Sequence, residues 1–442
     1  MTSPELEAEA SKIFQRESIE FEDFRRFTFK TRCFDGQFCS TYTARLLILK
    51  GILLEKAKSK WGHLLKDGLG KQSIVIGSLY KHQEMKPSIL KELSEELQLY
   101  PQPVRSSYYS SKDQLFIEDE TIRMKLVGNH INVEETITGT ICAILGHETD
   151  EGSFWVEDWC LPGCPAQASP LSAAPKCKGK ILFLSGLDLN SSAACLAKNL
   201  LIEWTSGMCG NSRTQAYQAS IVRVIIAGNS VQGSAAPRFS RGHDARKSQE
   251  SVAHAESALA SNRFDSFLSH LLNCCPVTLM PGEFDPTNHM IPQQPLHPCI
   301  LPKSSRFKSL HGATNPWIGR IGSRIVAGSS GQPINDIMKV ANVTESSPLF
   351  WLERTLTCRH FSPTSPDTLS EYPYSGEDPL VIQECPDIYF TGNMDKYETR
   401  MYTGDEGQSV RSICIPKFST TQTAVIVDLE SLEARPISFG TS

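Results

Sequence analysis

The sequence predicts a mixed α+β and α/β protein in which a small β-barrel precedes a larger α/β unit. Between residues 72 and 159, short apolar strands alternate with glycine-bearing turns, which is typical of a barrel. After residue 180, continuous apolar strands alternate with helical segments, which is typical of a sheet covered on both faces. The length of 442 residues is enough for two or three domains.

The composition excludes several classes of protein. Of the 442 residues, 40% are hydrophobic and 21% are charged, as in ordinary globular proteins. A net charge of -5 argues against an autonomous nucleic-acid binder, which usually carries a basic excess. No apolar run approaches the roughly 20 residues that cross a bilayer, and the acidic N-terminus does not resemble a signal peptide. We therefore expect no membrane contact, and reduced cysteines buried in the cores.

The first part of the chain divides into an arm and a barrel. Residues 1–39 are predicted to form an N-terminal arm. Residues 40–161 are predicted to form a helix followed by a barrel of about five strands, for which the OB-fold is the best match. The helix, residues 40–61, has apolar side chains at helical spacing, namely Tyr42, Leu46, Leu49 and Leu53. Residues 149–152 form the turn of a predicted hairpin, and residues 85–99 are either a helix or an extended insert.

A change of composition separates the barrel from the α/β unit. Residues 162–180 are rich in Pro, Ala and Ser and are predicted to be a linker or surface excursion, and residues 181–442 form the larger unit. Cys160, Cys164 and Cys177 lie around the linker. Because they lack a CxxC spacing, we interpret them as incidental thiols rather than a metal site.

The clearest helix of the larger unit is predicted over residues 251–275. Its apolar side chains recur at helical spacing: Phe264, Phe267, Leu268, Leu271 and Leu272. Just before it, residues 238–250 are locally basic. We interpret this basic segment either as a solvated loop or as a contact for a phosphate or an acidic partner.

Five predicted strands of the α/β unit end in tight turns that carry polar residues. The carboxyl ends of such strands form the crevice in which open α/β sheets bind ligands. We therefore expect the following turns to lie close together: Ser185-Gly186, Gly228-Asn229, Gly282-Glu283, Gly328-Ser329 and Gly392-Asn393.

The order of these strand ends resembles the calcineurin-like metallophosphoesterases, whose fold has two sheets flanked by helices. In that family the strand ends carry Asp-x-His, Gly-Asp, Gly-Asn-His-Asp/Glu and Gly-His-x-His, which hold two divalent cations roughly 3.5–4 Å apart. The resemblance implies that the metal site is degenerate here, with no catalytic residue and no bound metal or other cofactor. The corresponding positions are Gly186, Asp188, Asn229, Glu283, Phe284, Asn393 and Asp395.

An alternative is a rewired site in which acidic groups hold one Mg²⁺ or Mn²⁺, using Asp188, Glu283, Asp285, Asp395 and His289. We favour the interpretation that these groups cap loops and helix N-termini, because no histidine stands at a ligand position. The histidines nearest to the turns in sequence are His289, His297, His311 and His360. We also expect Asp285 to Cys299, which is rich in proline, to form a rigid surface loop for a protein partner.

A barrel followed by a phosphoesterase-like unit without its metal ligands resembles the B-subunit family of replicative DNA polymerases. Within that family, four long stretches resemble the small (second) subunits of DNA polymerase delta: LYPQPVRSSYY, MPGEFDPTNHMIPQQPLHPC, HFSPTSPDTLSEYPYSGEDPLVIQECPDIYFTGN and PKFSTTQTAVIVDLESLEARPISF. The resemblance covers most of residues 40–442 and is weakest over the N-terminal 35 residues and residues 160–180.

The resemblance implies a nuclear, non-catalytic scaffold in DNA replication and repair synthesis. Such a scaffold holds the cysteine-rich C-terminal domain of the catalytic subunit and recruits a third, clamp-binding subunit. It further allows a small fourth subunit, with the sliding clamp and DNA contacted indirectly. Two alternatives stay open: a residual metal-dependent phosphodiesterase or nuclease, and an OB-fold that binds single-stranded DNA through Tyr80, Phe116 and Trp155. The residues that contact each partner are not predicted.

Overall fold

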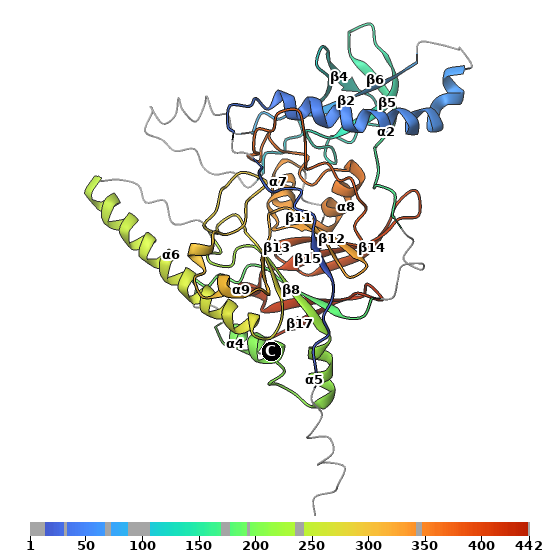
Figure 1. The fold of residues 1–442 in the computed structure, drawn as a ribbon. Coiled ribbons are helices and arrows are strands. Elements are labelled where there is room, and N and C mark those ends of the chain that lie inside the picture. The colour runs from blue at the N-terminus through green and yellow to red at the C-terminus, as the bar shows by residue number, and fades with distance from the viewer. Residues whose placement is uncertain are drawn as a thin grey trace, which may run out of the picture.

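A computed structural model shows the barrel at one end of the molecule and two stacked sheets with helices in the remainder (Figure 1). It describes residues 14–30, 33–66, 72–86, 107–168, 177–191, 195–234, 243–341 and 347–440. Within these ranges no helix has both the length and the apolar character needed to span a membrane.

The barrel is closed and has five strands. Helix α2 (Cys39–Lys66) precedes it and packs on its outside through Leu49, Leu53 and Trp61, which are buried. The strands are paired in the order β2-β3-β4-β6-β5, with the bounds Ser73–His82, Gln114–Glu118, Arg123–Val127, Phe154–Cys160 and Ile141–Glu148. The predicted helix, hairpin and barrel are confirmed. The predicted insert at residues 85–99 lies almost wholly outside the described residues.

Two six-stranded sheets form the α/β unit. The first has the order β1-β11-β12-β13-β15-β14, with the bounds Phe21–Asp23, Trp317–Ile321, Arg324–Ser329, Ile388–Met394, Ser409–Pro416 and Glu398–Thr403. The second has the order β10-β9-β8-β7-β16-β17, with the bounds Leu310–Gly312, Val277–Met280, Ile221–Ala227, Lys180–Leu184, Thr423–Asp428 and Ala434–Ser438. The predicted strands in both sheets are confirmed, and their central members are parallel.

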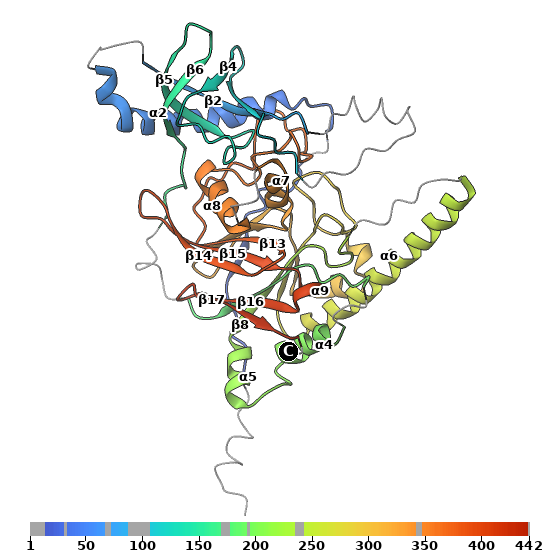
Figure 2. The ribbon, with the colours of Figure 1, turned by 180° about the vertical axis from the view of Figure 1, so that it is seen from behind.

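Helices cover the outer faces of both sheets (Figure 2). The second sheet carries α4 (Cys195–Thr205) and α6 (His243–Leu272), and α5 (Ser212–Ala219) precedes β8. The first carries α7 (Gln332–Val340) and α8 (Pro348–Cys358). Buried apolar side chains also fill the space between the two sheets. They include Phe183, Ile225, Phe390 and Ile413. The short helices are η1 (Pro298–Ile300), η2 (Ser304–Arg306) and α9 (Phe418–Thr421).

The N-terminal arm is tied to the α/β unit. β1 pairs antiparallel with β11 and so extends the first sheet. The guanidinium of Arg16 donates to the carbonyls of Thr205 and Gln218 at 2.7 and 3.0 Å. Phe27, further along the arm, is buried. The arm therefore contributes to the core of the larger unit over its described part.

Several boundaries differ from the predictions. Helix α6 begins at His243, so residues 243–250 of the segment interpreted as a loop are helical, because the following apolar helix continues backward through good helix formers. The first part of the predicted linker is packed: the Gly163 amide donates to the Thr357 carbonyl at 2.9 Å, and the Gln408 side chain donates to the Cys164 carbonyl at 3.1 Å. All the cysteines are free thiols, but the prediction that they are buried was wrong for six of them. Cys33, Cys39, Cys195 and Cys299 are exposed, and Cys209 and Cys274 are half-buried.

Candidate functional site

The five strand ends do gather, and we call the region they form the strand-end crevice. Asn393, in the last part of β13, is buried at its centre. Its side-chain amide donates to the carbonyls of Ala227 and Ser330 at 3.0 and 2.8 Å. Its main-chain amide donates to the Ser185 hydroxyl at 2.9 Å. A single asparagine thus links the ends of β7, β8, β12 and β13. β13 itself runs on to Met394, past the predicted turn, by way of an irregularity in its pairing with β15.

Asp285 fastens the turn after β9 to the turn after β8. Its carboxylate is buried and accepts main-chain hydrogen bonds from Gly282, Ser230 and Val231 at 2.9, 2.9 and 2.8 Å. Burial raises the pKa of this carboxyl to about 6, although the hydrogen bonds oppose the shift. Both oxygens are therefore committed to the backbone, which is the loop-capping role that we favoured.

The other polar residues predicted for the site make separate contacts and do not converge on one point. Asp188 accepts from the Gly233 amide at 3.0 Å, and Asn229 accepts from the Phe284 amide at 3.1 Å. Glu283 points to solvent. Asp395 forms an ion pair with Lys417 at 2.8 Å, and its side chain is 87% exposed. The carboxylates of the proposed rewired site are thus distributed over buried and exposed positions.

Backbone geometry closes the strand-end crevice against further side chains. Gly186 has a φ of 59°, and a Cβ there would lie 2.8 Å from the Asn393 Oδ1. A Cβ on Gly282 would lie 2.3 Å from the main-chain nitrogen of Asn229. Asn229 and Asn393 themselves have a left-handed backbone, with φ of 52° and 57°, a conformation that residues other than glycine, asparagine and aspartate rarely adopt. The strands approach so closely at Gly186 and Gly282 that neither position can take a side chain without movement of its neighbours.

The four histidines do not meet at the strand-end crevice. His289 is exposed, and His297 caps the short helix η1 by accepting from the Cys299 amide. His311 bonds to Asp23 of β1 at 2.9 Å, and His360 lies at the contact with the barrel. Over the part of the chain that the structure describes, no three His, Cys, Asp or Glu side chains come together in a way that would hold a metal ion. The donor set at the strand ends therefore does not fit the metal pair of a phosphoesterase.

The proline-rich stretch after β9 is only in part the surface loop that we expected: His289 and His297 are exposed, but its middle part is buried. Gln293 is fully buried. Its amide donates to the Gly282 carbonyl at 3.0 Å, and its side-chain oxygen accepts from the amides of Asn315 and Gln332, both at 2.8 Å. Ile291 and Pro292 are also buried. The prediction was wrong for this middle part, because the glutamine finds partners in distant loops that local sequence does not reveal.

The aromatic residues proposed for stacking on DNA lie on the outside of the barrel. Tyr80 and Phe116 are directly paired across β2 and β3. The guanidinium of Arg123 covers both rings, at 4.2 and 4.6 Å from their centroids. Trp155 lies on another strand, paired with Val127, and is 37% exposed. Two of the three rings are therefore already stacked against a cation.

A second group of buried polar residues joins the barrel region to the α/β unit, and we call it the barrel contact. Its centre is Arg45 of α2, which is fully buried. The guanidinium pairs with Asp378 at 2.6 Å and donates to the carbonyls of Pro363 and Ser365 at 3.0 and 2.9 Å. His360 shares the Asp378 carboxylate at 3.0 Å. The sequence did not single out Arg45, because there it is one of several cations on an amphipathic helix.

The buried ionisable groups of the barrel contact shift one another's pKa values. Burial, and then the neighbouring charge of Asp378, raise the pKa of Glu371 to about 8. Burial and the charge of Arg45 lower the pKa of His360 to about 4. Burial would raise the pKa of Asp378, but the charge of Arg45 and the bond from His360 outweigh it, and the net shift is downward. At neutral pH the cluster therefore consists of an Arg45–Asp378 ion pair with neutral Glu371 and His360.

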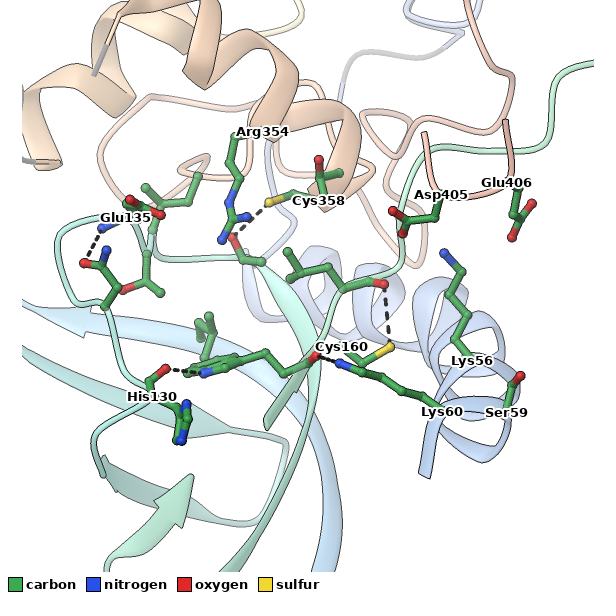
Figure 3. Close-up of a pocket in the computed structure, with 18 residues that line it drawn as sticks. Lys56, Ser59, Lys60, His130, Glu135, Cys160, Arg354, Cys358, Asp405 and Glu406 are labelled. Carbon is green, nitrogen blue, oxygen red and sulfur yellow. Dashed lines mark hydrogen bonds between the residues drawn. The ribbon is translucent and has the colours of Figure 1, made fainter. Parts of the chain in front are cut away.

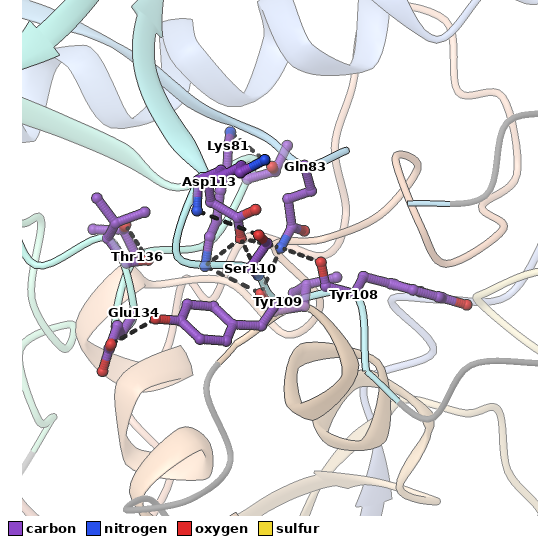
Figure 4. A network of polar contacts seen from close by, with 12 residues as sticks. Lys81, Gln83, Tyr108, Tyr109, Ser110, Asp113, Glu134 and Thr136 are labelled. Carbon is purple, nitrogen blue, oxygen red and sulfur yellow. Dashed lines mark hydrogen bonds and ion pairs between the residues drawn. The ribbon is translucent and has the colours of Figure 1, made fainter. Parts of the chain in front are cut away.

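The barrel also holds the C-terminal end of helix α7, through a polar network that includes Lys81, Gln83 and Asp113 (Figure 4). Lys81 and Gln83 of the barrel side donate to the Val340 carbonyl at 3.1 and 3.0 Å. Helix ends leave such carbonyls without partners, and a cation there is favourable. Gln83 also donates to Asp113 at 2.7 Å, and burial lowers the pKa of Lys81 to about 8. The sequence held one signal for this role: Lys81 lies two residues from the buried Leu79 on the same strand and so faces inward.

Comparison with known proteins agrees with both parts of this architecture. Residues 37–159 match the family model of the DNA polymerase delta subunit OB-fold domain. Residues 181–399 match the family model of the B-subunit of DNA polymerases alpha and epsilon. The first match confirms the OB-fold prediction for the barrel.

Three relatives align with nearly the whole chain. DNA polymerase delta subunit 2 of Drosophila melanogaster is 37% identical, over 93% of this chain and 95% of the relative. The DNA polymerase delta small subunit of Arabidopsis thaliana is 36% identical over 99% of both chains. That of Saccharomyces cerevisiae is 30% identical, over 93% of this chain and 91% of the relative. With an OB-fold barrel, a two-sheet α/β unit and identity of this extent, the chain belongs to the family of DNA polymerase delta small subunits.

Proposed function

We propose that this chain is a non-catalytic accessory subunit of DNA polymerase delta that acts in the nucleus as a scaffold for replication and repair synthesis. The full-length similarity to small subunits of this polymerase supports the assignment. In this role the chain tethers the cysteine-rich C-terminal domain of the catalytic subunit to the third, clamp-binding subunit. A small fourth subunit, the sliding clamp and DNA are reached through the same assembly.

The α/β unit, residues 181–442, is proposed to be a calcineurin-like phosphoesterase fold that has lost its metal site. Residues 1–39 then form the arm, residues 40–161 the helix and OB-fold domain, and residues 162–180 the linker. The observation that carries the proposal is the use of the polar side chains in the strand-end crevice. Asp285, Asn229 and Asn393 all hydrogen bond to backbone groups, so they seal the fold instead of presenting ligands.

The buried barrel contact fits a scaffold. It fastens the OB-fold to the α/β unit through charged groups that have no access to solvent, such as Arg45 and Asp378. Two units held in a fixed relation can present one continuous surface to several partners at once. A hydrolase would instead need acid-base groups and metal ligands converging on an accessible cleft.

Co-expression tests the proposal. The chain is produced together with the catalytic subunit of DNA polymerase delta, and the mixture is separated by size-exclusion chromatography. We expect one complex that contains both chains and has polymerase activity, whereas the chain alone has none. Separate elution of two stable, folded proteins would refute the assignment.

Neither alternative function gains support from the geometry. A residual phosphodiesterase would have to act through Asp395, which is exposed and paired with Lys417, or through Asp285, whose oxygens are occupied. A DNA-binding barrel would have to displace Arg123 from Tyr80 and Phe116 before bases could stack there.

A further inference from the structure

A cavity of about 610 Å³ lies where the barrel, helix α2 and the α/β unit meet (Figure 3). Its walls come from α2, the loop before β5, the end of β6, α8 and the turn between β14 and β15. Pockets that bind ligands usually have volumes of roughly 300–1,000 Å³. This cavity is distinct from the strand-end crevice and from the Arg45 cluster, and none of the interactions described above involves its charged lining.

Two cations face this cavity without a partner among the described residues. Arg354 of α8 is half-buried, and in Figure 3 its guanidinium extends from the helix toward the barrel. Lys56 of α2 is half-buried on another wall. Neither side chain has a hydrogen bond or an ion pair with any residue in the described ranges, unlike Lys60, which pairs with Asp158 at 2.8 Å. Half-buried cations of this kind are favourable binding groups for an anionic oxygen.

The main chain makes room for Lys56. Gly163 has a φ of 74°, and a Cβ at that position would lie 2.5 Å from the Lys56 ammonium. The segment around Gly163 is fixed by its bond to Thr357 of α8. The ammonium is thus placed over a glycine whose position depends on the α/β unit.

The remaining lining is apolar inside and acidic at the edges. Leu79 and Ile137 are buried in the wall, and Trp159 is half-buried beside them. Glu135 lies on the side of Arg354, and in Figure 3 Asp405 and Glu406 lie on the opposite side, above Lys56. Both acidic residues of the turn are exposed. With Lys56, Lys60 and Arg354, the lining therefore holds both cations and carboxylates around an apolar floor.

This mixture of cations, carboxylates and apolar groups favours some classes of ligand over others. A nucleic-acid strand carries a phosphate at every step, so the phosphates that do not reach Arg354 or Lys56 would lie against the carboxylates of the lining and be repelled. A purely apolar ligand would leave Arg354 and Lys56 desolvated and unpaired. A peptide can instead offer a carboxylate to Arg354, an apolar side chain to Leu79 and a cation to Asp405 and Glu406 within a few residues.

We propose that this cavity is a docking site for a peptide segment of a protein partner, with an acidic residue that pairs with Arg354 beside an apolar residue that fills the floor. The proposal concerns the chemistry of the segment and does not depend on which polymerase subunit carries it. Because the walls of the cavity come from both the barrel region and the α/β unit, the site requires an intact barrel contact.

Selection of random peptides displayed on phage against the full chain tests the proposal. We expect the enriched peptides to contain Asp or Glu next to an apolar residue. Peptides synthesised from the enriched sequences should bind the Arg354→Glu variant about tenfold more weakly or worse, because the charge-assisted pair becomes a repulsion. The control is Arg213→Glu, which makes the same change of charge at the start of α5, outside the cavity.

Both variants should remain folded, as judged by cooperative urea unfolding, since neither side chain has a hydrogen bond or an ion pair in the described structure to lose. Equal binding of the enriched peptides to wild type and Arg354→Glu would overturn the proposal. So would the absence of any acidic preference among the selected peptides. Stronger binding of an oligothymidylate to the wild type than to Arg354→Glu, with no peptide enriched, would point to nucleic acid and refute it as well.

Discussion

The strand-end crevice and the barrel contact both bury polar side chains, but they use them differently. In the crevice, Asn393 and Asp285 bond to main-chain groups of adjacent strand ends, so their role is local. In the barrel contact, Arg45 and Asp378 bond across 333 residues of sequence and join two separate units. In the described structure, the polar side chains at these strand ends therefore hold neighbouring strand ends together. The buried ion pair that joins the barrel region to the α/β unit lies elsewhere, in the barrel contact.

The largest effect is expected from removing the cation of the barrel contact. Arg45→Met leaves Asp378 as a buried charge without its partner, which should lower the free energy of unfolding by about 3–5 kcal/mol. Urea unfolding measures this loss. Lys50→Met, at an exposed cation on the same helix, is the matched control and should change stability by less than about 0.5 kcal/mol. Equal effects of the two substitutions would show that the barrel contact is unimportant.

The second largest loss of stability is expected from a substitution in the strand-end crevice. Asn393→Asp would place a carboxylate against the carbonyls of Ala227 and Ser330, in place of an amide that donates to both. We expect a loss of about 3 kcal/mol, because a buried charge is left without donors. Asn190→Asp at an exposed position is the control. If Mn²⁺ stabilised Asn393→Asp but not the control, the crevice would be open to metal ligands and its polar groups would not be purely structural.

The barrel contact should also respond to pH. The pKa of Glu371 rises from 4.5 to about 8 on folding, so the folded chain holds a proton that the unfolded chain has lost. Stability from this group is therefore lost as pH rises from about 4.5 to about 8. The pKa of His360 falls from 6.5 to about 4, so its contribution has the opposite sign and acts only below about pH 6.5.

Between pH 6.5 and 8 the Glu371 contribution should therefore dominate within this cluster, with a slope of at most about 1.4 kcal/mol per pH unit. Glu371→Gln cannot ionise and should flatten the slope measured by urea unfolding over this range. Glu377→Gln, at an exposed neighbour in sequence, should retain it. A slope that is unchanged in Glu371→Gln would mean that the buried carboxyl is already ionised at neutral pH.

The smallest change of stability is expected from a substitution of Asp395. Its ion pair with Lys417 is largely exposed, and exposed pairs contribute roughly 0–1 kcal/mol. Asp395→Ala should therefore unfold at nearly the same urea concentration as the wild type. A loss of several kcal/mol would show that this end of β13 has a larger structural role than an exposed ion pair can provide.

Local pattern explains which features could be predicted. The strands around Phe183 and Ile225 and the helix around Phe264 follow from apolar periodicity, because neighbouring residues alone determine which faces are buried. The gathering of strand ends followed from the parallel topology. Arg45 and Gln293 could not be assigned, since their partners are distant in sequence and a polar side chain does not reveal whether it is buried. The inward orientation of Lys81 could be predicted in part, because it shares a strand face with the apolar Leu79.

The central claim is that the strand-end crevice is structural. It is tested most directly by an assay for Mn²⁺-dependent phosphodiesterase activity, with a chromogenic phosphodiester, on the purified chain and on Asp285→Ala and Asp395→Ala. We predict that the wild type has no activity above a matched preparation of Asp395→Ala, at any Mn²⁺ concentration. Hydrolysis by the wild type that disappears in either variant would contradict the claim.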